Sequence, residues 1–312
     1  MGAKLHSMPE IPGKMKERFE AIFGRDYDKF EECCRNDYKK SFRVNTLKIS
    51  VEDALELLKG NGIITKRIPW TKNGFFTDVK SVGNSFENFM GYIYIQGPAS
   101  MLPAMVLDPN PGETVLDMCA SPGSKTTQIA AMMKNKGVLV ANESDYKRIK
   151  LLRFNNDKNG VLNSVITNLD GRDFAKSKLR FDKILLDAPC TGEGIVMREW
   201  EVIKRWNMKL VIKMCRLQKD LIASAISCLK PGGTLVYSTC TLSPEENEEV
   251  IDHALKIGGI ELEDIELKGI KTRKGLTSWD RYTYNERVSK CVRVWPQDNG
   301  TEGFFVAKLK KV

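Results

Sequence analysis

Two cysteines follow two predicted strands of this chain, each at the point where its strand ends. Cys190 lies in DAPCTGEG, three residues after Asp187, and Cys240 lies in STCTLSPEEN. Parallel sheets bind their ligands at the carboxyl ends of the strands, so one carboxyl group and two thiols are predicted to share a pocket. Either cysteine alone is more often a small buried apolar side chain. The pair, placed beside a carboxyl group at one edge, indicates an active site.

The remaining residue types narrow the chemistry. The eight cysteines include no C-x-x-C pair, and the two histidines are His6 and His253. A structural zinc site and histidine-dependent acid–base catalysis are therefore disfavoured, and we expect no metal. Catalysis must depend on Cys, Asp, Glu, Lys or a cofactor.

A cofactor loop is predicted where TVLDMCASPGSK joins a strand to a helix. Small and turn-forming residues let the backbone approach a ligand closely, and Ser124 is expected to cap the helix. The stretch is neither a G-x-G-x-x-G fingerprint nor a P-loop, and an ordinary strand–helix connection is the alternative. The loop residues expected to contact a nucleotide-like ligand with an anionic group are Cys119, Ala120, Ser121, Pro122, Gly123, Ser124 and Lys125.

Two acidic residues follow the next two predicted strands. Glu143, after VLVAN, is placed to accept hydrogen bonds from ribose hydroxyls, although a carboxylate also favours a helix start by itself. Asp170, in NLDGRD, could accept from an adenine amino group, and its alternative role is that of a turn residue before Gly171. Both carboxylates are candidates for binding the nucleoside part of a cofactor.

Regular alternation from Thr114 onward predicts an α/β domain with a parallel, doubly wound sheet. A last strand at 303–311 is expected to be antiparallel. The segment before residue 92 mixes helices and short strands and predicts a separate small α+β domain. Expected strands of the large domain are 114–118, 137–142, 164–169, 181–187 and 233–239, and its expected helices are 124–135, 145–159, 201–229 and 244–257.

Composition favours a polyanionic partner. The chain has 49 basic and 40 acidic residues, a net charge of +9. The excess lies mainly in 171–220, with 12 basic and 7 acidic residues, and in 265–312, with 11 and 5. Such segments suit RNA, and a solvated lysine-rich surface is the alternative. No apolar run is as long as the about 18 residues that a membrane-spanning helix needs. Residues 1–14 lack the apolar segment of a secretory signal peptide. We therefore expect a cytoplasmic protein with reduced cysteines and no membrane partner.

The three motifs DMCASPGSKT, DAPCTGEG and YSTCTLSPEEN, in this order, resemble the signatures of the RNA cytosine-C5 methyltransferases of the Sun/Fmu (NSUN-type) family. SFRVNT, IYIQGPASMLP and the terminal GFFVAKL are similar to that family as well, so the resemblance covers most of the chain. The resemblance implies a class I (Rossmann-like) methyltransferase domain at 93–312, which uses S-adenosylmethionine. It also implies an RRM-like, RNA-binding domain at 1–92.

The resemblance also implies the role of each site residue. Cys240 would be the nucleophile that attacks C6 of cytosine, Cys190 would assist release of the product, and Asp187 would act at the base ring. The cofactor would be held by the loop from Cys119 to Lys125, by Glu143 with Arg148 nearby, and by Asp170 and Asp187. Many relatives carry Asp where this chain has Glu143, and the charge is kept.

The predicted function is therefore formation of 5-methylcytosine in RNA, with tRNA favoured over ribosomal RNA by the compact architecture and the basic charge. A ribosomal RNA target and a catalytically silent RNA-binding relative remain the alternatives, and the second is disfavoured by the intact Asp187, Cys190 and Cys240. A DNA methyltransferase or an exocyclic-amine methyltransferase would need other motifs. The sequence does not give the oligomeric state, for which a monomer is the working expectation.

Overall fold

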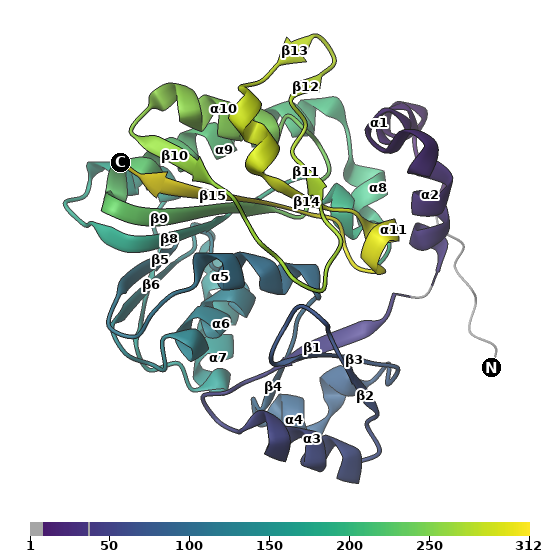
Figure 1. Ribbon diagram of the computed structural model, residues 1–312. Coiled ribbons are helices and arrows are strands. Elements are labelled where there is room, and N and C mark those ends of the chain that lie inside the picture. The colour runs from purple at the N-terminus through teal and green to yellow at the C-terminus, as the bar shows by residue number, and fades with distance from the viewer. Residues whose placement is uncertain (1–8, 37) are drawn as a thin grey trace.

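A mixed sheet forms the centre of the large domain in the computed structural model, which describes residues 9–36 and 38–312 (Figure 1). Within those residues the sheet has nine strands in the order β11-β14-β15-β9-β8-β5-β6-β7, with β10 paired to β15. The parallel strands are β5 (Thr114–Asp117), β6 (Val138–Asn142), β7 (Ser164–Thr167), β8 (Phe181–Asp187) and β9 (Leu229–Thr239). The antiparallel strands are β10 (Ile260–Glu263), β11 (Arg273–Lys274), β14 (Val292–Val294) and β15 (Phe304–Lys311).

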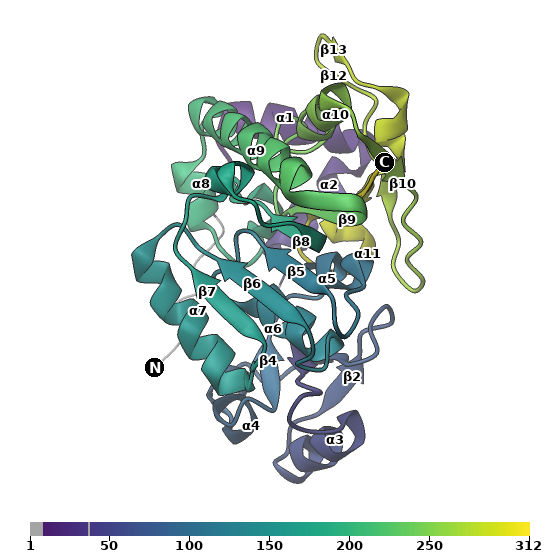
Figure 2. The ribbon, with the colours of Figure 1, turned by 90° about the vertical axis from the view of Figure 1, so that its left-hand side faces the viewer.

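Helices cover both faces of this sheet because successive strand residues point to opposite sides. Val115, Leu139, Leu185 and Val236 pack toward α5 and α6, whereas Leu116 and its neighbours pack toward α9 and α10. Figure 2 shows the parallel strands side by side, with α7 on one side and α9 on the other. The doubly wound α/β fold and the antiparallel last strand are thus confirmed. The helices are α5 (Leu102–Leu107), α6 (Ser124–Met132), α7 (Tyr146–Asn159), α8 (Glu201–Arg205), α9 (Met208–Cys228), α10 (Glu248–Ile257) and α11 (Pro296–Asn299).

Two local expectations differ from the structure. The single helix expected at 201–229 is interrupted after Arg205, because the Asn207 side chain accepts a hydrogen bond from the Leu210 N–H and starts α9 anew. Gly123, in the left-handed region at φ 105°, is the residue before α6, and Ser124 is already helical. Glycine is favoured there because it has no Cβ to oppose a positive φ.

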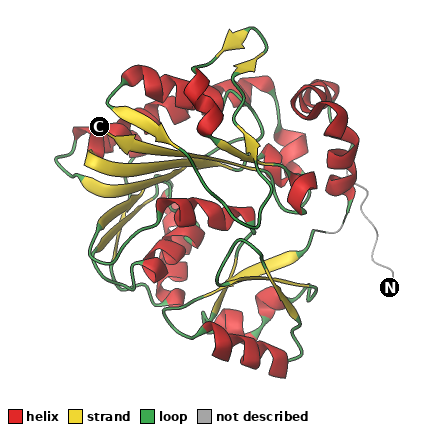
Figure 3. Ribbon diagram, viewed as in Figure 1, coloured by secondary structure: helices red, strands yellow, loops and turns green. Residues whose placement is uncertain are grey.

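The small domain is a four-stranded antiparallel sheet in the order β2-β3-β1-β4, with helices on its far face (Figure 3). Phe42, Val44, Phe75 and Ile93 form the core under those helices. The opposite face turns toward the large domain, where Arg43 Nη2 donates to Thr127 Oγ1 at 2.9 Å. The elements are β1 (Lys40–Val44), α3 (Val51–Gly60), β2 (Thr65–Arg67), β3 (Gly74–Thr77), α4 (Phe86–Phe89) and β4 (Ile93–Ile95), an RRM-like order.

The structure departs from a division of the chain at residue 92. β4 begins at Ile93 and belongs to the small sheet, where it pairs with β1. The first two helices, α1 (Gly13–Phe23) and α2 (Tyr27–Arg35), pack on the large domain instead (Figure 1). The rings of Phe23 and Trp295, for example, lie 5.0 Å apart, centroid to centroid. The apolar faces of these helices are complementary to the large domain, and sequence periodicity alone could not show which domain they cover.

A hairpin of β12 (Ser278–Trp279) and β13 (Tyr282–Thr283) extends beyond α10 (Figure 1). Among the described residues, no helix combines the length and the apolar character needed to cross a membrane. Residues 1–8, which form part of the segment in which no secretory signal was predicted, lie outside the described residues.

Candidate active site

Cys190 and Cys240 are brought together at the carboxyl edge of the sheet. β8 and β9 are parallel neighbours, and Asp187 is in register with Ser238, so the loops that follow these strands meet. The two sulfur atoms lie 3.4 Å apart, and both side chains are half-buried. The contact with Cys240, together with burial, raises the pKa of the Cys190 thiol well above its ordinary value. Either sulfur can be the S–H donor of this contact.

A buried carboxyl group, Glu246, connects the two cysteine loops from below. It accepts hydrogen bonds from the hydroxyl groups of Thr191 and Thr241, the residues that follow the two cysteines. Its other oxygen accepts from the Thr191 N–H at 3.0 Å and from Gln218 Nε2 at 2.9 Å. Burial and the neighbouring Glu193 raise the pKa of Glu246 to about 8. The sequence analysis did not identify Glu246 as a site residue. Its position six residues after Cys240 is the one feature of the sequence that could have indicated it.

Glu193 holds the outer side of the same loops. Its carboxylate accepts from Trp206 Nε1 and from the Ser243 hydroxyl at 2.7 Å, and Thr241 Oγ1 lies 3.2 Å away. Gly194 donates its N–H to the Cys240 carbonyl at 2.8 Å. A Cβ at Gly194 would meet that oxygen at 2.7 Å and the Gly303 oxygen at 2.3 Å, so the loops approach this closely only with glycine.

Asp187 lies next to the cysteine pair and is held from two sides. Lys125 Nζ lies 2.7 Å from its Oδ2, and the Ser238 hydroxyl donates to Oδ1 at 2.7 Å. Lys125 is buried, with 8% of its surface exposed, and it also donates to Ser100 Oγ at 3.1 Å. Lys125, in the first turn of α6, and Asp187, at the end of β8, thus form one ion pair. Together they can pass a proton to or from a ligand at this edge.

Asp117, at the end of β5, is fully buried in the turn that precedes α6. Thr126 Oγ1 donates to its Oδ2 at 2.7 Å, whereas Oδ1 has no hydrogen-bond partner among the described residues. Burial, assisted by the charge of Asp187, raises the pKa of Asp117 to about 7. An unpaired buried carboxyl oxygen is costly unless a ligand supplies a partner. Asp117 thus marks the floor of a ligand site.

Glu143 binds the first loop through Arg148. Glu143 is 4% exposed, its Oε2 lies 3.3 Å from Arg148 Nη1, and its Oε1 accepts from the Asp145 N–H at 2.9 Å. Arg148 Nη2 in turn donates to the Ser121 carbonyl at 2.8 Å. The structure therefore brings Glu143, Arg148 and the loop together, as the motifs predicted.

Asn142, the last residue of β6, joins three strand ends and was not predicted as a site residue. Its amide donates to the Met118 and Leu169 carbonyls, and its oxygen accepts from Thr167 Oγ1 at 2.8 Å and from the Leu169 N–H at 3.0 Å. Its own carbonyl accepts from the Ala120 N–H at 2.8 Å. It fixes the relative positions of the loops that would surround a cofactor.

The remaining predicted residues lie along the same rim. Asp170 is half-buried and forms an ion pair with Arg172 at 2.6 Å, and its Oδ1 also accepts from the Arg172 N–H. Its present partner is therefore a surface arginine. Desolvation raises the pKa of the Cys119 thiol, so this sulfur stays protonated and serves as an apolar wall. The Pro122 carbonyl accepts from Asn155 Nδ2 at 2.8 Å, which fastens the loop to α7.

These residues fit S-adenosylmethionine, which the sequence resemblance implies. The sulfonium and ribose of that molecule suit a rim of carboxyl groups, and Asp117 offers an oxygen that still lacks a partner. The carboxylate of S-adenosylmethionine suits Lys125 and the first turn of α6, where helix N–H groups are available. Across the described residues, no group of three His, Cys, Asp or Glu side chains could hold a metal ion.

Comparison with known proteins identifies the family of both domains. Residues 104–310 match the family model described as 16S rRNA methyltransferase RsmB/F, and residues 11–98 match the N-terminal domain of 16S rRNA methyltransferase RsmF. The structure of NSun6 from Pyrococcus horikoshii with SFG, an S-adenosylmethionine analogue, superimposes with a TM-score of 0.86 at 26% identity. The superposition covers 96% of this chain and 98% of that one.

Two curated relatives differ in the RNA that their names give. The chain is 40% identical to the tRNA (cytosine(49)-C(5))-methyltransferase of Pyrococcus abyssi, over 97% of both chains. It is 41% identical to the ribosomal RNA small subunit methyltransferase F of Vibrio parahaemolyticus over 98% of its own length. The chain spans 64% of the length of that Vibrio relative.

Proposed function

The chain belongs to the RsmB/F family of S-adenosylmethionine-dependent RNA cytosine-C5 methyltransferases, and from this premise we propose that it forms 5-methylcytosine in tRNA. The observation that carries the chemistry is the 3.4 Å contact between the Cys190 and Cys240 sulfur atoms beside Asp187. Two thiols and a carboxyl–lysine pair at the ligand-binding edge of one sheet suit covalent activation of a pyrimidine ring.

Cys240 acts as the nucleophile in this proposal. C5 of cytosine is a weak nucleophile, and addition of a thiolate at C6 turns it into an enamine-like carbon. The S–C6 bond forms while the ring electrons move toward N3, which takes up a proton. The Cys190 thiol, 3.4 Å away, can donate a hydrogen bond to the Cys240 sulfur, and the choice of Cys240 as nucleophile follows the resemblance of Ser238-Thr239-Cys240. The target base must leave its stack to reach this position.

Asp187 and Lys125 serve the base ring together. The expectation from sequence placed a carboxylic acid at Asp187, and the structure adds an ammonium group at 2.7 Å. The proton that N3 needs can therefore come from the pair, with the Ser238 hydroxyl holding the carboxylate in place. General acid assistance of this kind contributes typically 10²–10⁴-fold to a rate, by the order of magnitude seen in other enzymes.

Bound S-adenosylmethionine supplies the electrophilic methyl group. Lys125, Asp117, Glu143 and the loop from Cys119 to Ser124 are the residues that would hold it, and Asn142 keeps their loops in register. After methylation, the C5 proton passes to solvent, N3 returns its proton to the Lys125–Asp187 pair, and the S–C6 bond breaks with its electrons on the Cys240 sulfur, which restores the ring. Cys190 assists that cleavage by donating its S–H hydrogen bond to the departing sulfur 3.4 Å away.

The basic segments 171–220 and 265–312 and the 40% identity to the tRNA enzyme from Pyrococcus abyssi support tRNA as the first candidate. The rRNA enzyme from Vibrio parahaemolyticus is similar to the same extent, at 41% identity. Ribosomal RNA is the second candidate, because both family models carry 16S rRNA names.

Incubation of the purified protein with S-adenosylmethionine and unmodified tRNA or 16S rRNA, followed by bisulfite sequencing, tests the choice. New 5-methylcytosine in tRNA alone supports the proposal. Methylation of 16S rRNA alone replaces tRNA by the second candidate, and methylation of neither RNA contradicts the activity.

A further inference from the structure

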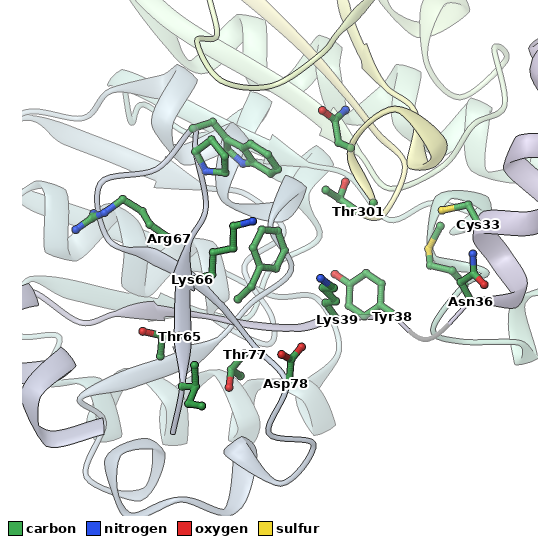
Figure 4. A pocket seen from close by; sticks show the side chains of 17 residues that line it. Cys33, Asn36, Tyr38, Lys39, Thr65, Lys66, Arg67, Thr77, Asp78 and Thr301 are labelled. Carbon is green, nitrogen blue, oxygen red and sulfur yellow. The ribbon is translucent and has the colours of Figure 1, made fainter. Parts of the chain in front are cut away.

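A cavity of about 430 Å³ lies outside the active site, between the small domain, the segment after α2 and the end of α11. This volume is in the range of pockets that enclose small ligands. Figure 4 shows its wall, with Lys66 on one side, Tyr38 and Lys39 across from it, and Thr301 above. The chemistry described so far does not use it.

One wall of the cavity is the helix-free face of the small sheet. Phe75 points into the core under α3 and α4, so the adjacent Phe76 points to the opposite face. Lys66 pairs with Phe76 across β2 and β3, and cross-strand partners share a face. The large domain covers this face near Arg43. At the β2–β3 edge the same face borders the cavity, with Phe76 half-buried and Lys66 exposed.

The aromatic part of this wall is held rigidly. The rings of Trp70 and Phe76 lie 6.5 Å apart with an interplanar angle of 82°. Trp70 Nε1 donates to the Pro98 carbonyl at 3.1 Å, which fixes the indole with its polar edge directed away from bulk water. A preformed aromatic surface of this kind loses little entropy when a flat ring stacks on it.

Uncompensated positive charge lies beside the aromatic wall. Lys39 and Lys66 are exposed, and in the range 9–36 and 38–312 neither side chain has a hydrogen bond or ion pair. Arg67 also borders the cavity but is directed away from it, with its guanidinium over the Phe75 ring at 4.9 Å (Figure 4). Asp78 is the acidic residue of the lining. This combination of aromatic rings and lysines fits a ligand in which a planar ring lies next to an anionic group.

A second groove borders this cavity at Tyr38. Tyr38 lines both, and the groove of about 290 Å³ continues along Lys40, Gln96 and Arg198. Gln96 Nε2 donates to the Ser100 carbonyl, and the Ser100 hydroxyl accepts from Lys125, the partner of Asp187. A polymer with one residue in the cavity could therefore extend into a second groove that carries Lys40 and Arg198 together with Glu199, and whose Gln96 is linked through Ser100 to Lys125.

We propose that this cavity binds an unpaired nucleotide of the RNA substrate, away from the target cytosine, with its base on Phe76, which the buried Trp70 supports from behind, and its phosphate at Lys66 and Lys39. The proposal rests on the proposed function, since it takes RNA as the substrate. Stacking on aromatic rings accepts any base, so the site adds affinity and register more than sequence selection.

Photo-cross-linking and kinetics test the site. An unmodified tRNA transcript containing 5-iodouridine is irradiated with the protein, and the cross-linked peptide is identified by mass spectrometry. We expect the adduct within residues 65–78 or at Tyr38. Lys66→Ala and Phe76→Leu, which keeps an apolar side chain, should each raise the KM for that transcript on the order of tenfold with kcat unchanged, as for the loss of one stacked base or phosphate contact.

Lys59→Ala is the matched control, because Lys59 is an exposed lysine in the last turn of α3, on the helix side of the same domain. It should leave the KM unchanged. Cross-links elsewhere, or a wild-type KM in both cavity variants, would overturn the site while tRNA methylation by the wild type stands. Conversely, cross-links at Phe76 from a protein that methylates no RNA would support the site and refute the proposed function.

Discussion

The Cys190 and Cys240 sulfur atoms lie 3.4 Å apart although fifty residues separate them in the chain. Two parallel strands end side by side, and one buried carboxyl group holds both of the following loops, through Thr191 and Thr241. The contact and burial raise the pKa of the Cys190 thiol. The proposed roles, attack by Cys240 and release assisted by Cys190, follow the resemblance of Ser238-Thr239-Cys240, and variants of the two cysteines test them.

Cys190→Ala should therefore trap the reaction half-way. Cys240 can still attack C6, but departure of its sulfur lacks the S–H donor, so a covalent protein–RNA complex should accumulate with cofactor present. It should survive denaturing gel electrophoresis. Cys240→Ala and the double variant should show no such band. A trapped band in Cys240→Ala would reverse the two roles.

Lys125→Ala should slow methyl transfer by on the order of 10²-fold, because the Asp187 carboxylate loses the ammonium group 2.7 Å away that assists it at the base ring. Single-turnover rates at saturating RNA and cofactor measure the chemical step apart from binding. Ser238→Ala is the matched control, since it removes a hydroxyl contact to the same carboxylate without removing charge. Equal effects of both substitutions would mean that Lys125 only positions Asp187.

Glu143→Ala should weaken S-adenosylmethionine binding by about 1.5–3 kcal/mol, the loss typical of a hydrogen bond to a charged group. Asp170→Ala should have a smaller effect, because Asp170 is already paired with Arg172 at 2.6 Å. Isothermal titration calorimetry of both variants compares the two carboxylates directly. An unchanged affinity in Glu143→Ala would leave that residue with only its contacts to Arg148 and the Asp145 N–H.

Glu246→Gln should change how the free energy of unfolding depends on pH. Burial raises the pKa of Glu246 to about 8 from an ordinary value near 4.5, so the folded state holds a proton that the unfolded state has released between these values. The stability of the wild type should therefore fall as pH rises from about 4.5 to 8, by on the order of a few kcal/mol from this group.

Glutamine remains neutral throughout that window and retains an acceptor for the Thr191 N–H. Denaturant unfolding at several pH values should show a flatter profile for Glu246→Gln than for the wild type. Parallel profiles would indicate that Glu246 is ionised in the folded protein.

Sequence patterns alone predicted the elements and the edge at which the site lies. Alternating strands and helices require a parallel sheet, and parallel strands place their carboxyl ends at one edge, so Asp187, Cys190, Glu143 and the loop before Ser124 could be assigned to one rim. These predictions need only local periodicity and chain direction, which are properties of short segments.

Tertiary packing decided the rest. The Lys125–Asp187 pair joins residues 62 positions apart, and Glu246 and Asn142 act through contacts with loops from other strands. The placement of α1 and α2 on the large domain, and of β4 in the small sheet, also depends on which surfaces are complementary in three dimensions. Neither periodicity nor spacing encodes such distances, because they arise only when separate elements pack against one another.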